Sequence, residues 1–384
     1  MRTGFLTAIA VSAPLVIVAC GGDEGPTQPA APLTFSAVSV GYLHTCGVTA
    51  AGAAFCWGEN FLGQLGDGTT TDRSSPVLVA GGVSFATVSA GGGHTCGVTA
   101  AGAYCWGYNQ DGEVGDGGTI SPRLGPVLVA GGVTFTAVSA GFNHTCGVTA
   151  AGAAFCWGEN FLGQLGDGTT TNRSNPVLVA GGVSFAAVSA GAYHTCGNTA
   201  EGAAYCWGNN SEGQLGDGTT TSRASPVLVA GGVSFAAVSA AGSEHTCGVT
   251  AAGAAYCWGE WSMLGGGDMS TTNALTPVLV VGGVSFAAVS AGFHHTCGVT
   301  AAGAAYCWGG NNYGELGDGT TTILTRLSPG LVVGGVSFAA VRAGDRYTCG
   351  ITAAGAAYCW GWNLYGQLGD GTTTDRLTPV GVVQ

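Results

Sequence analysis

Cysteine and histidine are the residues of this sequence whose spacing is regular enough to do chemistry. Fourteen of the 15 cysteines fall into seven pairs, with nine residues between the partners, or eight in one case. The first cysteine of a pair follows His-Thr in six copies, and the second always precedes Trp-Gly. Such a pattern could form seven disulfides or seven His-Cys-Cys zinc sites. The pairs are Cys46–Cys56, Cys96–Cys105, Cys146–Cys156, Cys196–Cys206, Cys247–Cys257, Cys297–Cys307 and Cys349–Cys359.

The spacing of the first pair predicts a β-hairpin that favours the disulfide. A three-residue turn, Ala-Ala-Gly with the glycine in the left-handed conformation, places Thr49 opposite Ala53. The same register places Cys46 opposite Cys56 as a non-hydrogen-bonded pair, whose close Cα spacing suits a cross-strand disulfide. The second pair is one residue closer and stays opposite if its turn shortens to two residues.

A zinc site is the alternative reading of the same residues. Nine intervening residues is not a usual spacing of zinc ligands, and Tyr347 stands where the other copies have histidine. We therefore predict one disulfide per repeat, no metal and no cofactor. Disulfides require an oxidising compartment, so this pairing also predicts export.

The unpaired cysteine, Cys20, follows an apolar stretch over residues 4–19. That stretch is too short to span a bilayer but is typical of a signal-peptide core. The sequence Ile-Val-Ala-Cys that ends it resembles a bacterial lipobox. We predict that residues 1–19 are a lipoprotein signal peptide, that Cys20 is lipidated, and that residues 20–34 are a flexible tether. The expected location is a bacterial membrane, the outer membrane or cell surface; an ordinary signal peptide with an incidental cysteine is the alternative.

From residue 35 the chain repeats one unit seven times, with a period of 50 to 52 residues. Short runs such as FAAVSAG, TCGVT and AAYCWG contain valine and aromatic residues, and glycines separate them. They predict three or four antiparallel strands per unit rather than helices. Periods of this size indicate a propeller or a solenoid. We predict an all-β, closed seven-bladed β-propeller over residues 35–384, sealed by pairing between strands near 35–40 and 379–383; an open solenoid is the alternative.

The composition excludes several classes of partner. The formal net charge is −12, and all nine basic residues are arginine. An acidic surface repels the phosphate backbone of nucleic acids and the anionic surface of lipid bilayers. We therefore expect no nucleic-acid partner, membrane contact only through the N-terminal lipid, and a monomer.

The repeat, written G-x-x-H-T-C-x-x-T-x-x-G-x-x-x-C-W-G-x-N-x-x-G-Q-L-G-D-G, resembles the regulator of chromosome condensation repeat family. The resemblance recurs seven times over residues 35–384 and implies a seven-bladed propeller. Departures affect single loops. In the fifth repeat Trp261 replaces the asparagine that follows Cys-Trp-Gly-x, and residues 264–267 read LGGG in place of GQLG. In the second repeat Glu113 replaces the glutamine of GQLG. The founding eukaryotic member is a guanine nucleotide exchange factor on chromatin, and exported bacterial relatives include an inhibitory protein that binds β-lactamases. Because fold does not fix function, we do not transfer the exchange activity to an acidic, exported chain.

Differences between the seven copies gather in two short stretches. One is the pair of residues before the repeated histidine, and the other follows Trp-Gly. In an antiparallel blade both stretches lie at the same end, so together they predict a binding surface on one rim. The candidate partner-binding residues are Tyr42, Phe61, Leu62, Tyr108, Phe142, Phe161, Leu162, Tyr193, Trp261, Phe293, Tyr313, Trp362 and Tyr365.

The residues that repeat have structural interpretations. We expect the histidine to form a turn or an inter-blade hydrogen bond, and the aspartate of GDG to cap a tight turn. Some of the rim aromatics are expected to pack between blades instead of binding. No copy holds its own carboxylate pair, nucleophile or metal cluster, so we predict a non-catalytic protein. The leading hypothesis is a protein-binding module of the cell envelope, and the alternative is carbohydrate or cell-wall binding.

Overall fold

The computed structural model describes Met1 and residues 33–242, 244–267 and 272–383. Contacts divide the chain after Ala31, and the unit that begins at Pro32 contains every strand. The predicted signal peptide, the lipidation site at Cys20 and most of the tether lie outside the described residues. No helix in the described part of the chain is long and apolar enough to cross a membrane.

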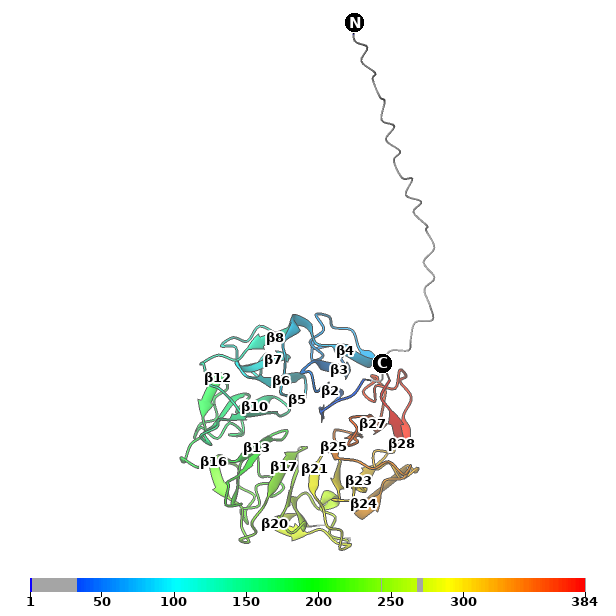
Figure 1. Cartoon of the computed structure of the whole chain (residues 1–384). Coiled ribbons are helices and arrows are strands. Elements are labelled where there is room, and N and C mark those ends of the chain that lie inside the picture. Colours follow the sequence, from blue (N-terminus) through cyan, green and yellow to red (C-terminus); the bar gives the residue numbers. More distant parts are fainter. Residues whose placement is uncertain (2–32, 243, 268–271, 384) are drawn as a thin grey trace. The chain divides into compact units, whose positions relative to one another are not determined.

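The seven repeats form seven four-stranded antiparallel sheets, arranged as the blades of a propeller around a central channel (Figure 1). The prediction of a seven-bladed propeller is confirmed. Within each blade the strands follow one another in chain order from the channel outward. The innermost strands are β1 (Ala37–Val40), β5 (Thr87–Ala90), β9 (Ala137–Ala140), β13 (Ala187–Ala190), β17 (Ala237–Ala241), β21 (Ala288–Ala291) and β25 (Ala340–Ala343).

The second and third strands of each blade form the predicted hairpin. The second strands are β2 (His44–Val48), β6 (His94–Thr99), β10 (His144–Val148), β14 (His194–Asn198), β18 (His245–Val249), β22 (His295–Val299) and β26 (Tyr347–Ile351). The third strands are β3 (Ala54–Gly58), β7 (Gly102–Gly107), β11 (Ala154–Gly158), β15 (Ala204–Gly208), β19 (Ala255–Gly259), β23 (Ala305–Asn311) and β27 (Ala357–Gly361).

The outer strands complete the blades, and two short 3₁₀ turns lie outside the sheets. The outer strands are β4 (Arg73–Leu78), β8 (Arg123–Leu128), β12 (Arg173–Leu178), β16 (Arg223–Leu228), β20 (Ala274–Leu279), β24 (Thr322–Leu331) and β28 (Arg376–Gly381). The 3₁₀ turns are η1 (Ala80–Gly82) and η2 (Trp261–Met263).

The hairpin register confirms the disulfide prediction. Cys46 lies opposite Cys56, the Thr49 N–H donates to the Ala53 carbonyl at 2.9 Å, and the turn glycine is left-handed. All seven predicted pairs are bonded, with Cα atoms 4.0 to 4.1 Å apart, as expected of non-hydrogen-bonded positions. In the second blade Thr99 pairs with Gly102 across a two-residue turn, so the cysteines stay opposite each other as predicted.

Neighbouring blades meet at seams that the repeated residues build. The buried His44 Nε2 lies 2.8 Å from the Thr95 hydroxyl of the next blade, and Thr95 donates its hydrogen to the Gln64 carbonyl at 2.8 Å. Because that single hydroxyl hydrogen is used, His44 must donate through Nε2. Trp106 Nε1 donates to the same carbonyl at 2.9 Å. The expected inter-blade role of the histidine is confirmed, and it recurs at His94, His144, His194, His245 and His295.

The aspartates of the GDG turns also have the predicted structural role. Asp67 Oδ1 accepts the N–H and hydroxyl of Thr69, at 2.9 and 2.7 Å. Its second oxygen accepts two hydrogen bonds from the Arg73 guanidinium. Similar arginine–aspartate pairs recur in five other blades, so six of the chain's nine arginines are bound to these turns.

The ring closes in a different way from the one predicted. β1 pairs with β2 and β28 pairs with β27, so the terminal strands do not pair with each other. Each repeat already supplies all four strands of its own blade, and no strand is left to complete a neighbour. The first and last blades instead pack side by side, as the six other seams do (Figure 1). Tyr347 donates to the His44 carbonyl at 2.7 Å and accepts from the Thr45 hydroxyl at 3.1 Å, which replaces the histidine–threonine contact.

Candidate functional site

The two variable stretches meet at the same end of every blade. In all seven blades the residue after Trp-Gly donates its N–H, at 2.8 to 2.9 Å, to the carbonyl of the residue before His or Tyr347. In the first blade this bond joins Glu59 to Leu43. We call the surface formed by these two loops in the seven blades the divergent face, because it carries the residues that differ between repeats.

Glycines allow the divergent face to close over the channel. The Tyr42 N–H donates to the Gly91 carbonyl of the next blade at 3.0 Å, and Phe142 and Phe293 make the same bond farther round the ring. A Cβ on Gly91 would lie 2.4 Å from the next glycine carbonyl, which no side chain tolerates. This close approach of neighbouring strands explains the glycine that directly precedes each variable pair, three residues before the histidine or Tyr347. It brings the side chain that follows the glycine over the channel axis.

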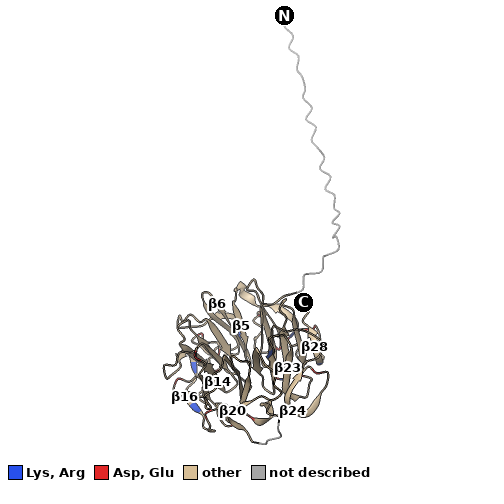
Figure 2. Ribbon diagram, turned by 60° about the horizontal axis from the view of Figure 1, so that its bottom comes forward, with Lys and Arg blue, Asp and Glu red and all other residues tan. Residues whose placement is uncertain are grey.

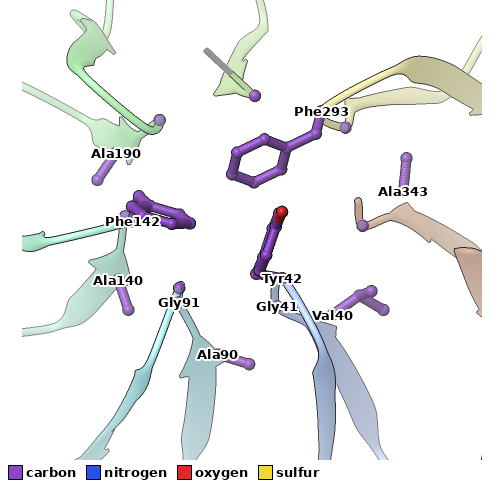
Figure 3. Close-up of a pocket in the computed structure, with 16 residues that line it drawn as sticks. Val40, Gly41, Tyr42, Ala90, Gly91, Ala140, Phe142, Ala190, Phe293 and Ala343 are labelled. Carbon is purple, nitrogen blue, oxygen red and sulfur yellow. The ribbon is translucent and has the colours of Figure 1, made fainter. Parts of the chain in front are cut away.

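Three of those side chains meet at the mouth of the channel (Figure 3). Tyr42, Phe142 and Phe293 come from the first, third and sixth blades and point toward one another. Their ring centroids lie 5.0 to 5.7 Å apart in tilted, edge-to-face arrangements, and Tyr193 lies 6.3 Å from Phe142. We call Tyr42, Phe142 and Phe293 the hub. All three remain half-buried, so they present an apolar surface at the centre of the divergent face.

A second aromatic group lies between the sixth and seventh blades. The Trp362 ring is 5.6 Å from Tyr313 and 5.8 Å from Tyr365. The Arg346 guanidinium lies 5.3 Å from the centre of the Tyr313 ring and 5.9 Å from that of Trp362, which are cation–π distances.

Two further polar groups connect this arginine to the hub. The buried Asp345 carboxylate lies 3.3 Å from His294 Nε2 and 3.8 Å from Arg346 Nε. Burial raises the pKa of Asp345 to about 6, although Arg346 acts in the opposite direction. Asp345 directly follows Gly344, whose carbonyl accepts the Phe293 N–H at 2.9 Å, and burial and then Asp345 raise the pKa of Tyr42. We call His294, Tyr313, Asp345, Arg346, Trp362 and Tyr365 the blade 6–7 cluster.

Carboxylates surround the rest of the divergent face. Burial and the nearby Asp72 raise the pKa of Glu59. Burial and the neighbouring Glu212 and Glu260 raise the pKa of Glu244. Charged residues are otherwise sparse on the propeller (Figure 2). A ligand of this face would therefore meet an apolar centre inside a mainly acidic rim.

The predicted rim residues divide into groups that sequence spacing does not show. Phe61 and Phe161 are 75% and 65% exposed. They lie in loops between the third and fourth strands of their blades, whereas the hub residues lie between the first and second strands. Leu162 is exposed, while Leu62 lies against Gly93 of the next blade. Tyr108 hydrogen-bonds to Gln110, and Trp261 packs on the core between the fifth and sixth blades. Trp261 therefore fits the expectation that some rim aromatics pack between blades.

Sequence reasoning missed three members of the blade 6–7 cluster as site residues. His294, Asp345 and Arg346 belong to the variable pairs, but they are not aromatic or apolar and were not among the candidates. The available signal was that the seventh blade replaces apolar or small residues with a charged pair. In the described residues, no three His, Cys, Asp or Glu side chains gather as metal ligands would.

Comparison with known proteins places this geometry in a family. The family model of the RCC1-like domain matches residues 19–281 and 134–384, which together cover nearly the whole chain. This chain belongs to the RCC1-like domain family. Propellers of this family commonly mediate protein interactions. The resemblance inferred from the repeats is thus confirmed.

Curated relatives match only short segments. The ultraviolet-B receptor UVR8 of Arabidopsis thaliana is 44% identical over 69 residues, which are 17% of this chain and 15% of UVR8. The human E3 ubiquitin-protein ligase HERC2 is 50% identical over 44 residues, 12% of this chain and 1% of HERC2. The matches therefore span a small part of either relative.

Solved structures resemble the whole propeller. Human WBSCR16 superposes with a TM-score of 0.79 at 22% identity, over 86% of this chain and 95% of that one. Yeast RCC1 (Prp20), solved with Kap60 bound, gives 0.76 at 18% identity, over 91% and 85%. At these identities the likeness shows the shared fold.

Proposed function

We propose that this chain is a non-catalytic binding protein of the bacterial cell envelope that engages a protein partner through the divergent face. The observation that carries the proposal is the hub. Aromatic side chains from three separate repeats meet at the centre of the end of the blades where differences between the repeats gather, while the residues that repeat build seams and turns. Half-buried aromatic groups at the centre of a surface are typical anchors of protein interfaces.

The chemistry of the face specifies the partner. The hub offers an apolar centre, and Glu59 and Glu244 belong to an acidic surround. We expect a partner surface with an exposed apolar or aromatic side chain flanked by lysine or arginine, because opposite charges speed and orient association. An acidic protein partner or a nucleic acid would be repelled.

Site-specific photo-crosslinking tests this proposal. A photoreactive phenylalanine analogue at Phe61 or Phe161 would lie on the divergent face. The same analogue at the exposed Ala151 would lie in the turn between β10 and β11, at the opposite end of the blade. Irradiation in cells should crosslink one protein from the first two positions and not from the third. Crosslinks from Ala151 alone would overturn the assignment of the face.

Carbohydrate or cell-wall binding is the second candidate, and the blade 6–7 cluster favours it. Trp362, Tyr313 and Tyr365 form an aromatic surface beside the charged groups of Asp345 and Arg346, which is the combination of stacking and hydrogen bonding that sugar rings require. Retention of the purified chain on isolated cell wall, lost in Trp362→Ala and unchanged in Phe61→Ala, would support this candidate over a protein partner.

The envelope location rests on the N-terminal sequence and has its own test. If Cys20 is lipidated, cells fed labelled palmitate should incorporate label into the wild-type chain and not into Cys20→Ser. Absence of label from both chains would contradict membrane anchoring. It would not affect the assignment of the propeller or of its binding face.

A further inference from the structure

The channel below the hub contains a polar chamber that the proposed function does not use. Its volume is about 360 Å³, and the innermost strands of the seven blades line it. Six blades contribute a serine at the same strand position, and the seventh contributes Arg342. The register is the same in each case: Ser39 lies opposite Cys46, and Arg342 lies opposite Cys349. The serines are Ser39, Ser89, Ser139, Ser189, Ser239 and Ser290.

The serines are hydrogen-bond donors held in place by the seams. Ser39 Oγ accepts the Ala90 N–H of the next blade at 2.9 Å, and the five other serines accept the equivalent N–H at 2.9 to 3.1 Å. A hydroxyl that accepts in this way still carries its own hydrogen. Among the described contacts, that hydrogen is used by Ser189, which donates to the Ala240 carbonyl. The chamber therefore presents five positioned hydroxyls, those of the serines other than Ser189, whose hydrogens no described contact uses.

Arg342 is the cation of this chamber. Its Nη1 donates to the Val341 carbonyl at 3.1 Å, and no carboxylate in the described part of the chain lies within ion-pair distance. The arginines of the GDG turns differ, because each is paired with an aspartate, as Arg73 is with Asp67 at 2.8 Å. The Arg342 side chain is reached by solvent in the channel although protein surrounds it, and burial lowers the pKa of its guanidinium. A guanidinium that solvent reaches and no described carboxylate pairs is free to bind an anion.

The hub lies over one end of the chamber, and side chains at the other end are exposed to solvent. Its lining shares Val40, Ala90, Ala140 and Ala343 with the pocket beneath the hub, so the aromatic rings cover that end (Figure 3). At the other end of the inner strands, side chains such as Thr87 are exposed. A small solute can enter from the end opposite the divergent face, and a polymer is too large for the chamber.

We propose that this chamber binds a small oxyanion, with Arg342 as the charged ligand and the serine hydroxyls as neutral donors. The planar guanidinium donates two parallel hydrogen bonds to an oxyanion such as phosphate or sulfate, and hydroxyls complete its coordination. The chain's net charge of −12 opposes anions at long range, so binding must come from these short-range contacts. The site is independent of any partner on the divergent face.

The repeats supply a matched variant for the test. Arg342→Ser gives the seventh blade the residue that the other six already have, so it should fold normally. Arg342→Lys keeps the charge and loses the planar fork. Arg73→Ala is the control for net charge, because the fifth blade has Ala274 at the equivalent strand position, outside the chamber. The purified full-length chain is titrated with inorganic phosphate and with sulfate in Tris buffer, and binding is followed by calorimetry and by ³¹P line broadening.

Wild type and Arg73→Ala should bind phosphate or sulfate saturably with the same affinity, within about threefold. Arg342→Ser should bind at least tenfold more weakly, and Arg342→Lys should fall between them. Equal affinity of wild type and a folded Arg342→Ser would show an adventitious ion only and would overturn the proposal. Absence of saturable binding of both anions to wild type would overturn it as well.

Discussion

The seams between blades and the divergent face use neighbouring positions of the same strand-and-loop unit, yet they behave in opposite ways. At a seam, His44 and Thr95 repeat with the same contact around the ring, and every polar group is buried. On the divergent face, one or two residues away, Tyr42 and Phe142 stand where other blades have Gly92 or Ala192. Repetition within the chain therefore marks what holds the blades together, and divergence marks what is free to bind.

The seam between the last and first blades shows how strictly this division holds. Tyr347 replaces the histidine there, but it makes equivalent contacts with the neighbouring strand and is fully buried. A difference at a seam position is thus a substitution that preserves the contact. Differences on the face are not compensated in this way, because the hub rings come from three blades that do not touch at a seam.

The largest expected effect on the framework is loss of stability in acid. The six seam histidines are fully buried, and burial lowers their pKa to about 3, or about 4 for His194. The unfolded chain takes up these protons below a pH of about 6.5, whereas the folded chain stays neutral until much lower pH. Each histidine therefore removes up to about 1.4 kcal/mol of stability per pH unit as the pH falls from 6.5 toward 3.

Calorimetric Tm values at pH 7, 5.5 and 4.5, with the disulfides intact, measure this effect. Five carboxyl groups have a raised pKa and act in the opposite direction: Glu59, Glu113, Glu244, Glu315 and Asp345. They are outnumbered by the six histidines together with five turn aspartates whose pKa is lowered, Asp67, Asp167, Asp217, Asp318 and Asp370. Tm should fall steadily over this range. A constant or rising Tm would show that the seams are not the neutral histidine contacts described.

Loss of a single seam contact should lower the free energy of unfolding by a smaller but still measurable amount. Thr95→Val keeps the shape of the side chain and removes the hydroxyl that accepts from His44, leaving a buried ring nitrogen without that partner. We expect a loss of about 1–3 kcal/mol in the free energy of unfolding by denaturant. The exposed Thr70→Val is the matched control and should change it by less than about 0.5 kcal/mol. Equal effects of the two variants would refute the special role of the seam.

Glu113, in the loop after Trp-Gly of the second blade, gives a test of how a residue near the divergent face affects stability. It occupies the position of the glutamine in most repeats, accepts the Asp111 N–H at 3.0 Å, and burial raises its pKa to about 8. Since the folded chain holds this proton between the unfolded pKa near 4.5 and pH 8, stability falls as the pH rises through that range. Glu113→Gln removes the titration. We expect the variant to be more stable than wild type by about 1 kcal/mol or more at pH 9 and nearly equal at pH 5; the reverse order would contradict the assignment.

The smallest expected effect on stability belongs to the outer loops. Phe61→Ala and Phe161→Ala truncate rings that are 75% and 65% exposed, so the Tm should be nearly unchanged. Phe135→Ala, at 2% exposure, is the matched core control and should cost about 3–5 kcal/mol. A large loss of stability in the outer-loop variants would mean that these rings are part of the framework.

The local parts of this architecture could be predicted from the sequence, and the parts that join distant repeats could not. The turn of residues 50–52 fixes the register that pairs Cys46 with Cys56, and repetition predicts the blades. The hub depends on residues 100 or more positions apart meeting across an axis, which no local pattern encodes. Ring closure was predicted wrongly because the sequence left open whether a repeat has three or four strands. Each repeat forms all four strands of its own blade, so the terminal strands have no partner to complete.

The central claim, that binding resides on the divergent face, is tested most directly by capture from native envelope with three forms of the chain. These are wild type, a hub variant with Tyr42→Ala, Phe142→Ala and Phe293→Ala (Ala192 is the precedent in the fourth blade), and an opposite-end variant with Ala51→Arg and Ala151→Arg. All three are first checked for folding by Tm. Wild type and the opposite-end variant should retain the same protein, and the hub variant should lose at least nine-tenths of it. Retention by the folded hub variant together with loss in the opposite-end variant would contradict the claim.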